Sequence, residues 1–184
     1  MSETQIERYG PVAQALHWLI AALIFVMLGL GYYMEDLPEG TGKLELYGLH
    51  KSIGITIALL AALRLVWRLL NPPPPLPAGM TPWERRAAGI VHASLYLMLF
   101  VQPLVGFLQS NAAGVPVVLW GFVLLPALIG PDEALGETLI GVHAVGGNLL
   151  AILVIVHVAA ALRHHFVLKD DVLRRMLPGP AVPR

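Results

Sequence analysis

The chain has 184 residues, of which 57% are apolar and 13% are charged, whereas soluble domains average about 25% charged residues. Because so few charges cannot cover a globule of this size, the composition predicts a membrane protein. Basic and acidic residues number 12 each, so no nucleic-acid partner is expected. Cysteine is absent, which excludes disulfides, cysteine-ligated zinc, iron–sulfur clusters and covalent Cys-x-x-Cys-His haem attachment. The seven histidines are the remaining candidates for soft-metal ligands.

Four stretches with few or no charges are each long enough to cross a bilayer, which takes about 20 helical residues. They cover residues 12–34, 46–70, 87–109 and 138–162. The first is too long for the apolar part of a signal peptide, so we expect it to be retained as a helix. The sequence therefore predicts an all-α, four-helix membrane bundle formed by one domain, residues 1–184, with a flexible tail at 178–184.

Residues 115–129 form a further apolar segment that is only 15 residues long and has Pro116 and Pro126 near its ends. A fifth span is one interpretation, but an interfacial or re-entrant outer loop is favoured. With four spans and both termini cytoplasmic, ten basic residues lie inside and only Lys43 and Lys51 lie outside, as the positive-inside rule requires. The inner residues are Arg8, Arg64, Arg68, Arg85, Arg86, Arg163, Lys169, Arg174, Arg175 and Arg184.

Two connections support these boundaries. Residues 71–77 contain four consecutive prolines, which predicts a stiff polyproline II spacer on the inner side. Thr81 and Glu84 have the spacing of a capping box, with Pro82 at the first helical position, so the third helix is expected to begin there.

Five histidines lie inside the predicted spans and fall at two depths. His50 and His143 lie near the outer ends of their helices, whereas His17, His92 and His157 lie near the inner ends. Fourteen residues separate His143 from His157, so both rings leave the same helix face about 21 Å apart. A histidine in hydrocarbon is a functional candidate by default, although a hydrogen-bonded packing group is the alternative.

The absence of carboxylates from the spans argues against magnesium, calcium and di-iron sites, and also against a metal-ion transporter. Bis-histidine haem fits better, because the porphyrin supplies the other four ligands. Small residues near the histidines would leave room for a porphyrin, although ordinary helix packing also uses small residues. Three histidines compete for the two inner axial positions, and spacing does not choose between them. The small residues are Gly54, Gly106, Gly146, Gly147, Ala160 and Ala161.

Several motifs together resemble the bacterial cytochrome b561 family of four-helix di-haem membrane proteins, over residues 9–177. They are Ala15-Leu16-His17-Trp18, Leu49-His50-Lys51-Ser52-Ile53-Gly54, Arg64-Leu65-Val66-Trp67-Arg68, Pro103-Leu104-Val105-Gly106, His143 with His157, and residues 161–175. The resemblance implies that His50 and His143 hold an outer haem b and that His17 and His157 hold an inner one, both without covalent links. His92 is then left beside a quinone.

Short members of the family look like superoxide oxidases of the bacterial inner membrane. By this resemblance, single electrons pass from superoxide at the periplasmic face to ubiquinone near the cytoplasmic face. Protons would come from an inner cluster in which His92, His164 and Lys169 are the candidate catalytic groups, beside His165 and Asp170. For His164, His165 and Lys169, a basic collar that sets topology is the alternative.

Three cationic side chains and one glycine are further candidates for haem contacts. Arg64 and Arg68 would pair with the inner propionates or extend to the interface, Lys51 would act in the same way at the outer haem, and Gly54 would lie against that haem.

A runner-up function keeps the fold but relays electrons between quinone and a redox partner docked at the periplasmic face, as in hydrogenase or formate dehydrogenase subunits. Seven outer acidic residues would not attract superoxide. They are Glu35, Asp36, Glu39, Glu45, Asp132, Glu133 and Glu137.

Overall fold

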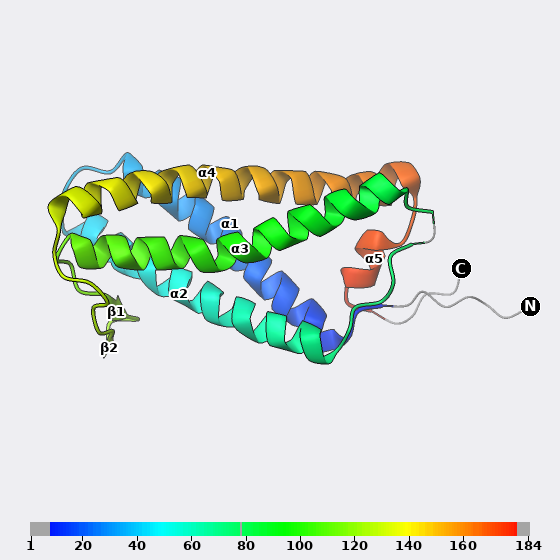
Figure 1. Cartoon of the computed structure of the whole chain (residues 1–184), viewed down its shortest axis with the longest axis horizontal. Helices are drawn as coiled ribbons and strands as arrows, with labels where there is room; N and C mark the ends of the chain where they lie inside the picture. The colour runs from blue at the N-terminus through cyan, green and yellow to red at the C-terminus, as the bar shows by residue number, and fades with distance from the viewer. Residues whose placement is uncertain (1–7, 78, 180–184) are drawn as a thin grey trace, which may run out of the picture.

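The computed structural model describes residues 8–77 and 79–179, and over this part of the chain it contains four long helices side by side (Figure 1). They are α1 (Pro11–Glu35), α2 (Thr41–Leu70), α3 (Pro82–Ala112) and α4 (Glu133–Arg163). Each is long and apolar enough to cross a membrane. The predicted four-helix membrane bundle is therefore confirmed. Arg184 and positions 180–184 of the predicted tail lie outside the described residues.

All four predicted spans lie within these helices, and each helix extends beyond its apolar stretch. The predicted capping box starts α3: Thr81 Oγ1 accepts a hydrogen bond from the Glu84 backbone N–H, and Glu84 Oε2 accepts one from the Thr81 backbone N–H at 3.0 Å. Arg163 at the end of α4 forms a salt bridge of 3.0 Å with Glu84. The cap thus also links α3 to α4.

The bundle has two distinct ends (Figure 1). We call the one where α1 meets α2 and α3 leads to α4 the hairpin end; the other, where Tyr9 N–H bonds Arg175 O at 3.2 Å, is the termini end. A small buried core joins α1, α2 and α3 and consists of Ile20, Ile24, Ile53, Ile57, Ala61 and Leu99. Most other large apolar side chains point outward, as in a bundle whose solvent is lipid.

The predicted loop at 115–129 is confirmed as non-helical, so a fifth helical span is not present within it. It contains a small antiparallel hairpin that the sequence did not predict, formed by β1 (Val118–Leu119) and β2 (Val123–Leu124). Residues 71–77 adopt no helix or strand. The carbonyl of Pro75 within this segment accepts a hydrogen bond from Arg175.

The chain after α4 was not predicted in detail. A short π-helical turn, η1 (His164–Leu168), follows α4 directly and ends at Lys169, which has a left-handed φ of 55°. Helix α5 (Val172–Met176) then turns back against α1. Its carbonyls accept hydrogen bonds from Trp18 Nε1 at 2.8 Å and from Gln14 Nε2 at 3.1 Å. These bonds hold α5 over the termini end.

Candidate functional site

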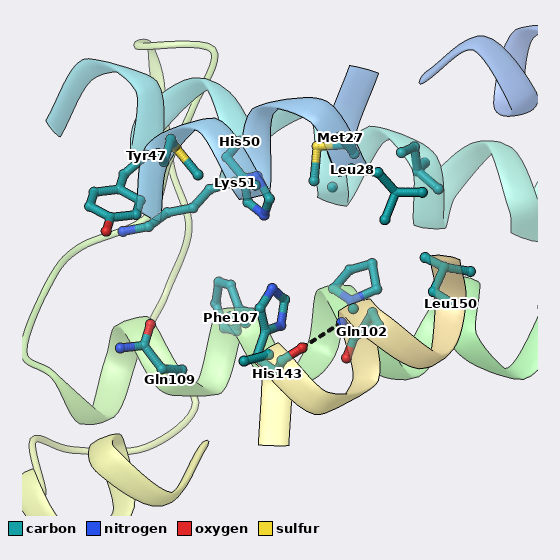
Figure 2. A pocket seen from close by; sticks show the side chains of 18 of the residues that line it. Met27, Leu28, Tyr47, His50, Lys51, Gln102, Phe107, Gln109, His143 and Leu150 are labelled. Carbon is teal, nitrogen blue, oxygen red and sulfur yellow. Dashed lines mark hydrogen bonds between the residues drawn. The ribbon is translucent and has the colours of Figure 1, made fainter. Parts of the chain in front are cut away.

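Two histidines from non-neighbouring helices face each other across a cavity at the hairpin end (Figure 2). His50 belongs to α2 and His143 to α4, and their ring centroids are 6.1 Å apart. The cavity measures about 440 Å³, within the range of about 300–1,000 Å³ typical of cofactor sites. The sequence placed these two side chains at one depth, and the structure brings them together.

The separation of the two rings suits a metal bound between them. Two metal–nitrogen bonds of about 2 Å and two ring radii of about 1.1 Å place the centroids of opposed imidazole ligands about 6.2 Å apart. The Nδ1 atoms of His50 and His143 are buried and have no hydrogen-bond partner among the described residues. Because a buried ring nitrogen without a partner costs free energy, the two rings are candidates for binding a group that the described residues do not supply. The pair therefore fits a bis-histidine haem.

Glycines leave space for both rings and for the cavity. A Cβ built on Gly106 would lie 2.9 Å from His143 Cε1, and one built on Gly31 would lie 3.6 Å from His50 Cε1. Gly54, which the sequence predicted beside a haem, lines the cavity one turn from His50. Gly106 therefore leaves room for the His143 ring, and the porphyrin contact expected from the sequence stays a prediction.

Gln102 on α3 is a site residue that the sequence analysis missed. It is buried in the cavity wall, and its Nε2 donates a hydrogen bond of 2.9 Å to the backbone carbonyl of His143 (Figure 2). A Cβ on Gly146 would overlap the Gln102 carboxamide, so Gly146 allows this contact. A buried amide inside an uncharged span was the available signal.

Polar groups gather at the outer side of this cavity. Lys51, a predicted haem contact, lines it together with Tyr47 and Gln109 (Figure 2). Lys51 and Tyr47 come from α2 and Gln109 from α3, so both helices contribute polar groups to the lining of this cavity. A cation with two neutral hydrogen-bonding groups suits an anion such as a carboxylate. Tyr47 and Gln109 were not predicted.

Three histidines form a second cluster nearer the termini end. The His17 and His157 ring centroids are 6.1 Å apart, the same separation as in the first pair. The His92 and His157 centroids are only 5.3 Å apart, which is shorter than the separation of about 6.2 Å expected for opposed ligands of one metal. The geometry therefore suits His17 with His157 as a ligand pair and leaves His92 beside it.

Arg64 is the predicted cation best placed at this cluster. Its Nε donates to the Tyr96 hydroxyl at 3.0 Å and its Nη1 donates to the Ala13 carbonyl at 3.3 Å. These bonds hold the half-buried guanidinium between α1, α2 and α3, so Arg64 cannot simply extend to the interface. Arg68, one turn further along α2, is exposed.

The remaining predicted groups lie beyond α4. His164 is buried, and its Nδ1 lies 2.6 Å from Asp170 Oδ2. Lys169 is exposed at the left-handed turn between them. His164 and Asp170 therefore form a pair in direct contact, whereas the Lys169 side chain is exposed.

Across residues 8–77 and 79–179, no group of three or more histidine, cysteine or acidic side chains could hold a metal ion unaided. Each histidine pair offers two ring ligands, which fits haem, because the porphyrin supplies the other four ligands.

Comparison with known proteins agrees with this conclusion. The family model for prokaryotic cytochrome b561 matches residues 8–179. The chain is 38% identical to cytochrome b561 homolog 2 of Escherichia coli over 173 residues, covering 93% of this chain and 92% of that protein. It is 26% identical to the probable superoxide oxidase CybB of Yersinia pestis (94% and 97% covered) and 29% identical to cytochrome b562 of Cereibacter sphaeroides (95% and 98%). The chain therefore belongs to the prokaryotic cytochrome b561 family of membrane electron-transfer cytochromes, which bind haem b.

Proposed function

We propose that this protein is a di-haem cytochrome that carries single electrons across the bacterial inner membrane from superoxide at the periplasmic face to ubiquinone near the cytoplasmic face. The observation that carries the proposal is the pair of 6.1 Å histidine separations at two depths of one bundle. His50 and His143 would hold one haem b, and His17 and His157 the other. Haem held by two axial histidines supplies one-electron chemistry and leaves no open coordination position.

The positions of the two pairs along α4 support transfer across the membrane. His143 and His157 are 14 residues apart, about 21 Å along the helix axis. Each pair takes its second ligand from α1 or α2, so both sites lie between the two halves of the bundle. With a haem held at each pair, the apolar layer would be crossed in two shorter electron transfers in place of one long transfer.

The orientation that we propose places the hairpin end in the periplasm and both termini in the cytoplasm. Among the described residues, all basic side chains except Lys43 and Lys51 belong to the termini end, which the positive-inside rule assigns to the cytoplasm. They are Arg8, Arg64, Arg68, Arg85, Arg86, Arg163, Lys169, Arg174 and Arg175.

The proposed overall reaction balances with the two substrates alone. Two superoxide ions lose one electron each and become two molecules of O₂, and one ubiquinone takes up the two electrons with two protons to become ubiquinol. His92, whose ring lies 5.3 Å from that of His157, would contact the quinone. The His164–Asp170 pair and the exposed Lys169 would be the proton-transfer groups on the cytoplasmic side.

Cationic groups would orient the charged parts of the bound molecules. Arg64, fixed by Tyr96 and Ala13, would pair with a propionate of the haem near the cytoplasm, and Arg68 with the other. Lys51, with Tyr47 and Gln109 beside it, would do the same at the periplasmic haem or receive superoxide. Such charge pairing strengthens where water is excluded.

The test is the haem content of the purified chain, measured by pyridine haemochrome against protein mass. We expect about two haems b per chain, and about one in His50→Ala, His143→Ala, His17→Ala and His157→Ala variants. A wild-type protein with one haem, or with none, would overturn the di-haem proposal. Superoxide generated enzymatically should then reduce ubiquinone in proportion to the amount of the reconstituted chain.

A second candidate function rests on the acidic hairpin end. Glu35, Asp36, Glu39 and Glu45 are all exposed there, which would repel superoxide and would suit a basic face of a docked redox protein. In that case the donor is the partner and not superoxide. Superoxide would then fail to reduce ubiquinone through the isolated, fully haem-loaded chain, whereas a co-purifying redox subunit would restore turnover.

A further inference from the structure

The hairpin between α3 and α4 is the part of the bundle least explained by electron transfer. Its strands pair Val118 with Leu124 and Leu119 with Val123, and it folds beside α2 at the hairpin end (Figure 1). No charged residue occurs between positions 113 and 131. Its turn is unusual, since Trp120 has a φ of 53° and Gly121 a φ of 81°.

A hydrogen bond fixes this turn to α2. The backbone N–H of Trp120 donates to Ser52 Oγ at 2.9 Å, and Ser52 Oγ donates in turn to the Gly48 carbonyl at 2.9 Å. A bulky residue at positive φ is rare and costs of order 1–3 kcal/mol unless its surroundings hold it. Ser52 and Val117 are almost completely buried where the hairpin meets the bundle. The hairpin is therefore a fixed part of the bundle wall.

The anchoring residue sets the depth of the turn. Ser52 lies seven residues beyond Glu45, the one acidic residue of α2, and therefore about 10 Å further along the helix axis. It also lies next to Lys51 and two residues beyond His50. The turn is thus level with the His50–His143 cavity, and Val117 lines that cavity. The turn therefore lies beside the apolar part of α2 and not beside its acidic first turns.

The side of the hairpin that faces away from the bundle is apolar, and its side chains are exposed. The exposed fractions of Phe122, Leu124 and Leu128 are 78%, 66% and 65%. In water such side chains would form an unfavourable apolar patch. Helix α2, against which the hairpin packs, also exposes apolar side chains, since Leu59 and Leu63 are 63% and 54% exposed.

The backbone of the hairpin also meets the requirement for residence in lipid. Phe122 N–H bonds the Leu119 carbonyl at 3.2 Å, Leu125 N–H bonds the Val117 carbonyl at 3.0 Å, and Leu128 N–H bonds Asn111 Oδ1 at 2.8 Å. Asn111 is itself buried at the end of α3. In hydrocarbon, backbone donors must be satisfied within the protein, whereas a loop in water needs no such set of bonds.

We propose that residues 115–128 form a re-entrant hairpin whose partner is the lipid bilayer, inserted into the leaflet at the hairpin end. Phe122, Leu124 and Leu128 contact acyl chains. The hairpin forms part of the bundle wall beside α2, where Val117 lines the His50–His143 cavity. The proposal depends on the membrane bundle and not on the electron donor or acceptor.

The absence of cysteine makes a direct test practicable. Phe122→Cys and, separately, Leu128→Cys would carry a nitroxide spin label in the haem-loaded protein, reconstituted in phosphatidylcholine–phosphatidylglycerol vesicles. Power saturation compares collisions with O₂, which enters lipid, and with a water-soluble nickel chelate. The matched control for lipid is Ile152→Cys on α4, whose side chain is 58% exposed. The matched control for water is Glu137→Cys in the first turns of α4, which is also exposed.

We expect the logarithm of the O₂-to-nickel collision ratio to be positive at positions 122 and 128, as at 152, and negative at 137. A negative value at both hairpin positions would overturn the proposal and would leave the apolar patch in water, where a protein partner would cover it. Two separate label positions are used so that a distortion caused by one label does not decide the result. An unchanged haem-to-protein ratio establishes that each labelled variant is folded.

Discussion

The His143 ring packs directly against the backbone of Gly106, so closely that a Cβ on Gly106 would lie 2.9 Å from His143 Cε1. Helix α3 therefore limits where the ring on α4 can lie. Because the ring is proposed as an axial ligand, it cannot turn away from an added methyl group without losing its alignment with His50.

Gly106→Ala should consequently weaken haem binding at the hairpin end. Overpacking costs about 1–3 kcal/mol, or roughly a 5- to 150-fold loss of affinity, and Gly106→Leu should remove that haem altogether. The control is Gly89→Ala on the same helix, where an added Cβ meets nothing within 4 Å. Haem titration with absorbance spectroscopy checks both; equal affinities in the two alanine variants would contradict the prediction.

Gln102 should stabilise the contact between α3 and α4 through its bond to the His143 carbonyl. Gln102→Leu keeps the volume but removes the donor, and hydrogen bonds between membrane helices contribute about 0.6 kcal/mol on average, with a maximum of about 1.7. We expect a loss in this range in the free energy of unfolding, measured by denaturation in mixed micelles.

Thr138→Val is a suitable comparison for Gln102→Leu, because the Thr138 hydroxyl donates to the Ala134 carbonyl within its own helix. This variant should change the free energy of unfolding very little. A Gln102→Leu protein as stable as Thr138→Val would show that the hydrogen bond has no net effect.

The sequence predicted the parts of this fold that depend on hydrophobic stretches and local caps. The four spans follow from length and charge, and the start of α3 follows from Thr81, Pro82 and Glu84, because capping involves residues three positions apart. The depth of each histidine was predictable for the same reason, since the rise along a helix depends only on residue number.

Contacts between helices were not predictable from spacing. The ring separations of 6.1 Å for His17–His157 and 5.3 Å for His92–His157, which favour one pair over the other, depend on how the helices are rotated about their axes. The hairpin turn at Trp120 was missed because a tryptophan with positive φ follows no local preference. The turn is held by the hydrogen bond from the Trp120 backbone N–H to Ser52 Oγ, and these two residues are 68 positions apart.

His92 should be dispensable for haem binding but not for quinone reduction. His92→Ala is expected to keep both haems, because the His17–His157 pair has the separation of opposed ligands. Loss of a positioned proton-transfer group typically lowers a rate by about 100-fold or more, so ubiquinone reduction should fall by about that factor. Loss of one haem in His92→Ala would instead make His92 a ligand.

The side-chain hydrogen bonds from α1 should contribute to holding α5 over the termini end, beside the Tyr9–Arg175 and Arg175–Pro75 bonds. Trp18 Nε1 bonds the Met176 carbonyl and Gln14 Nε2 bonds the Arg175 carbonyl, and the Trp18 ring also lies edge-on to His17 with centroids 5.1 Å apart. In a Gln14→Leu, Trp18→Phe double variant, both bonds are lost while an aromatic ring remains beside His17.

Two lost hydrogen bonds amount to about 1–3 kcal/mol, which should raise the population of undocked α5 by roughly 5- to 150-fold. Trypsin cleavage after Arg174 and Arg175 under native conditions measures this population, because cleavage follows the open form when opening is fast. Tyr32→Phe is the matched control, since it loses a single side-chain bond of 2.8 Å, to Asn148, away from α5. If the double variant were cleaved no faster than Tyr32→Phe, the bonds to α1 would not be what holds α5 in place, and the His164–Asp170 pair would be the next contact to remove.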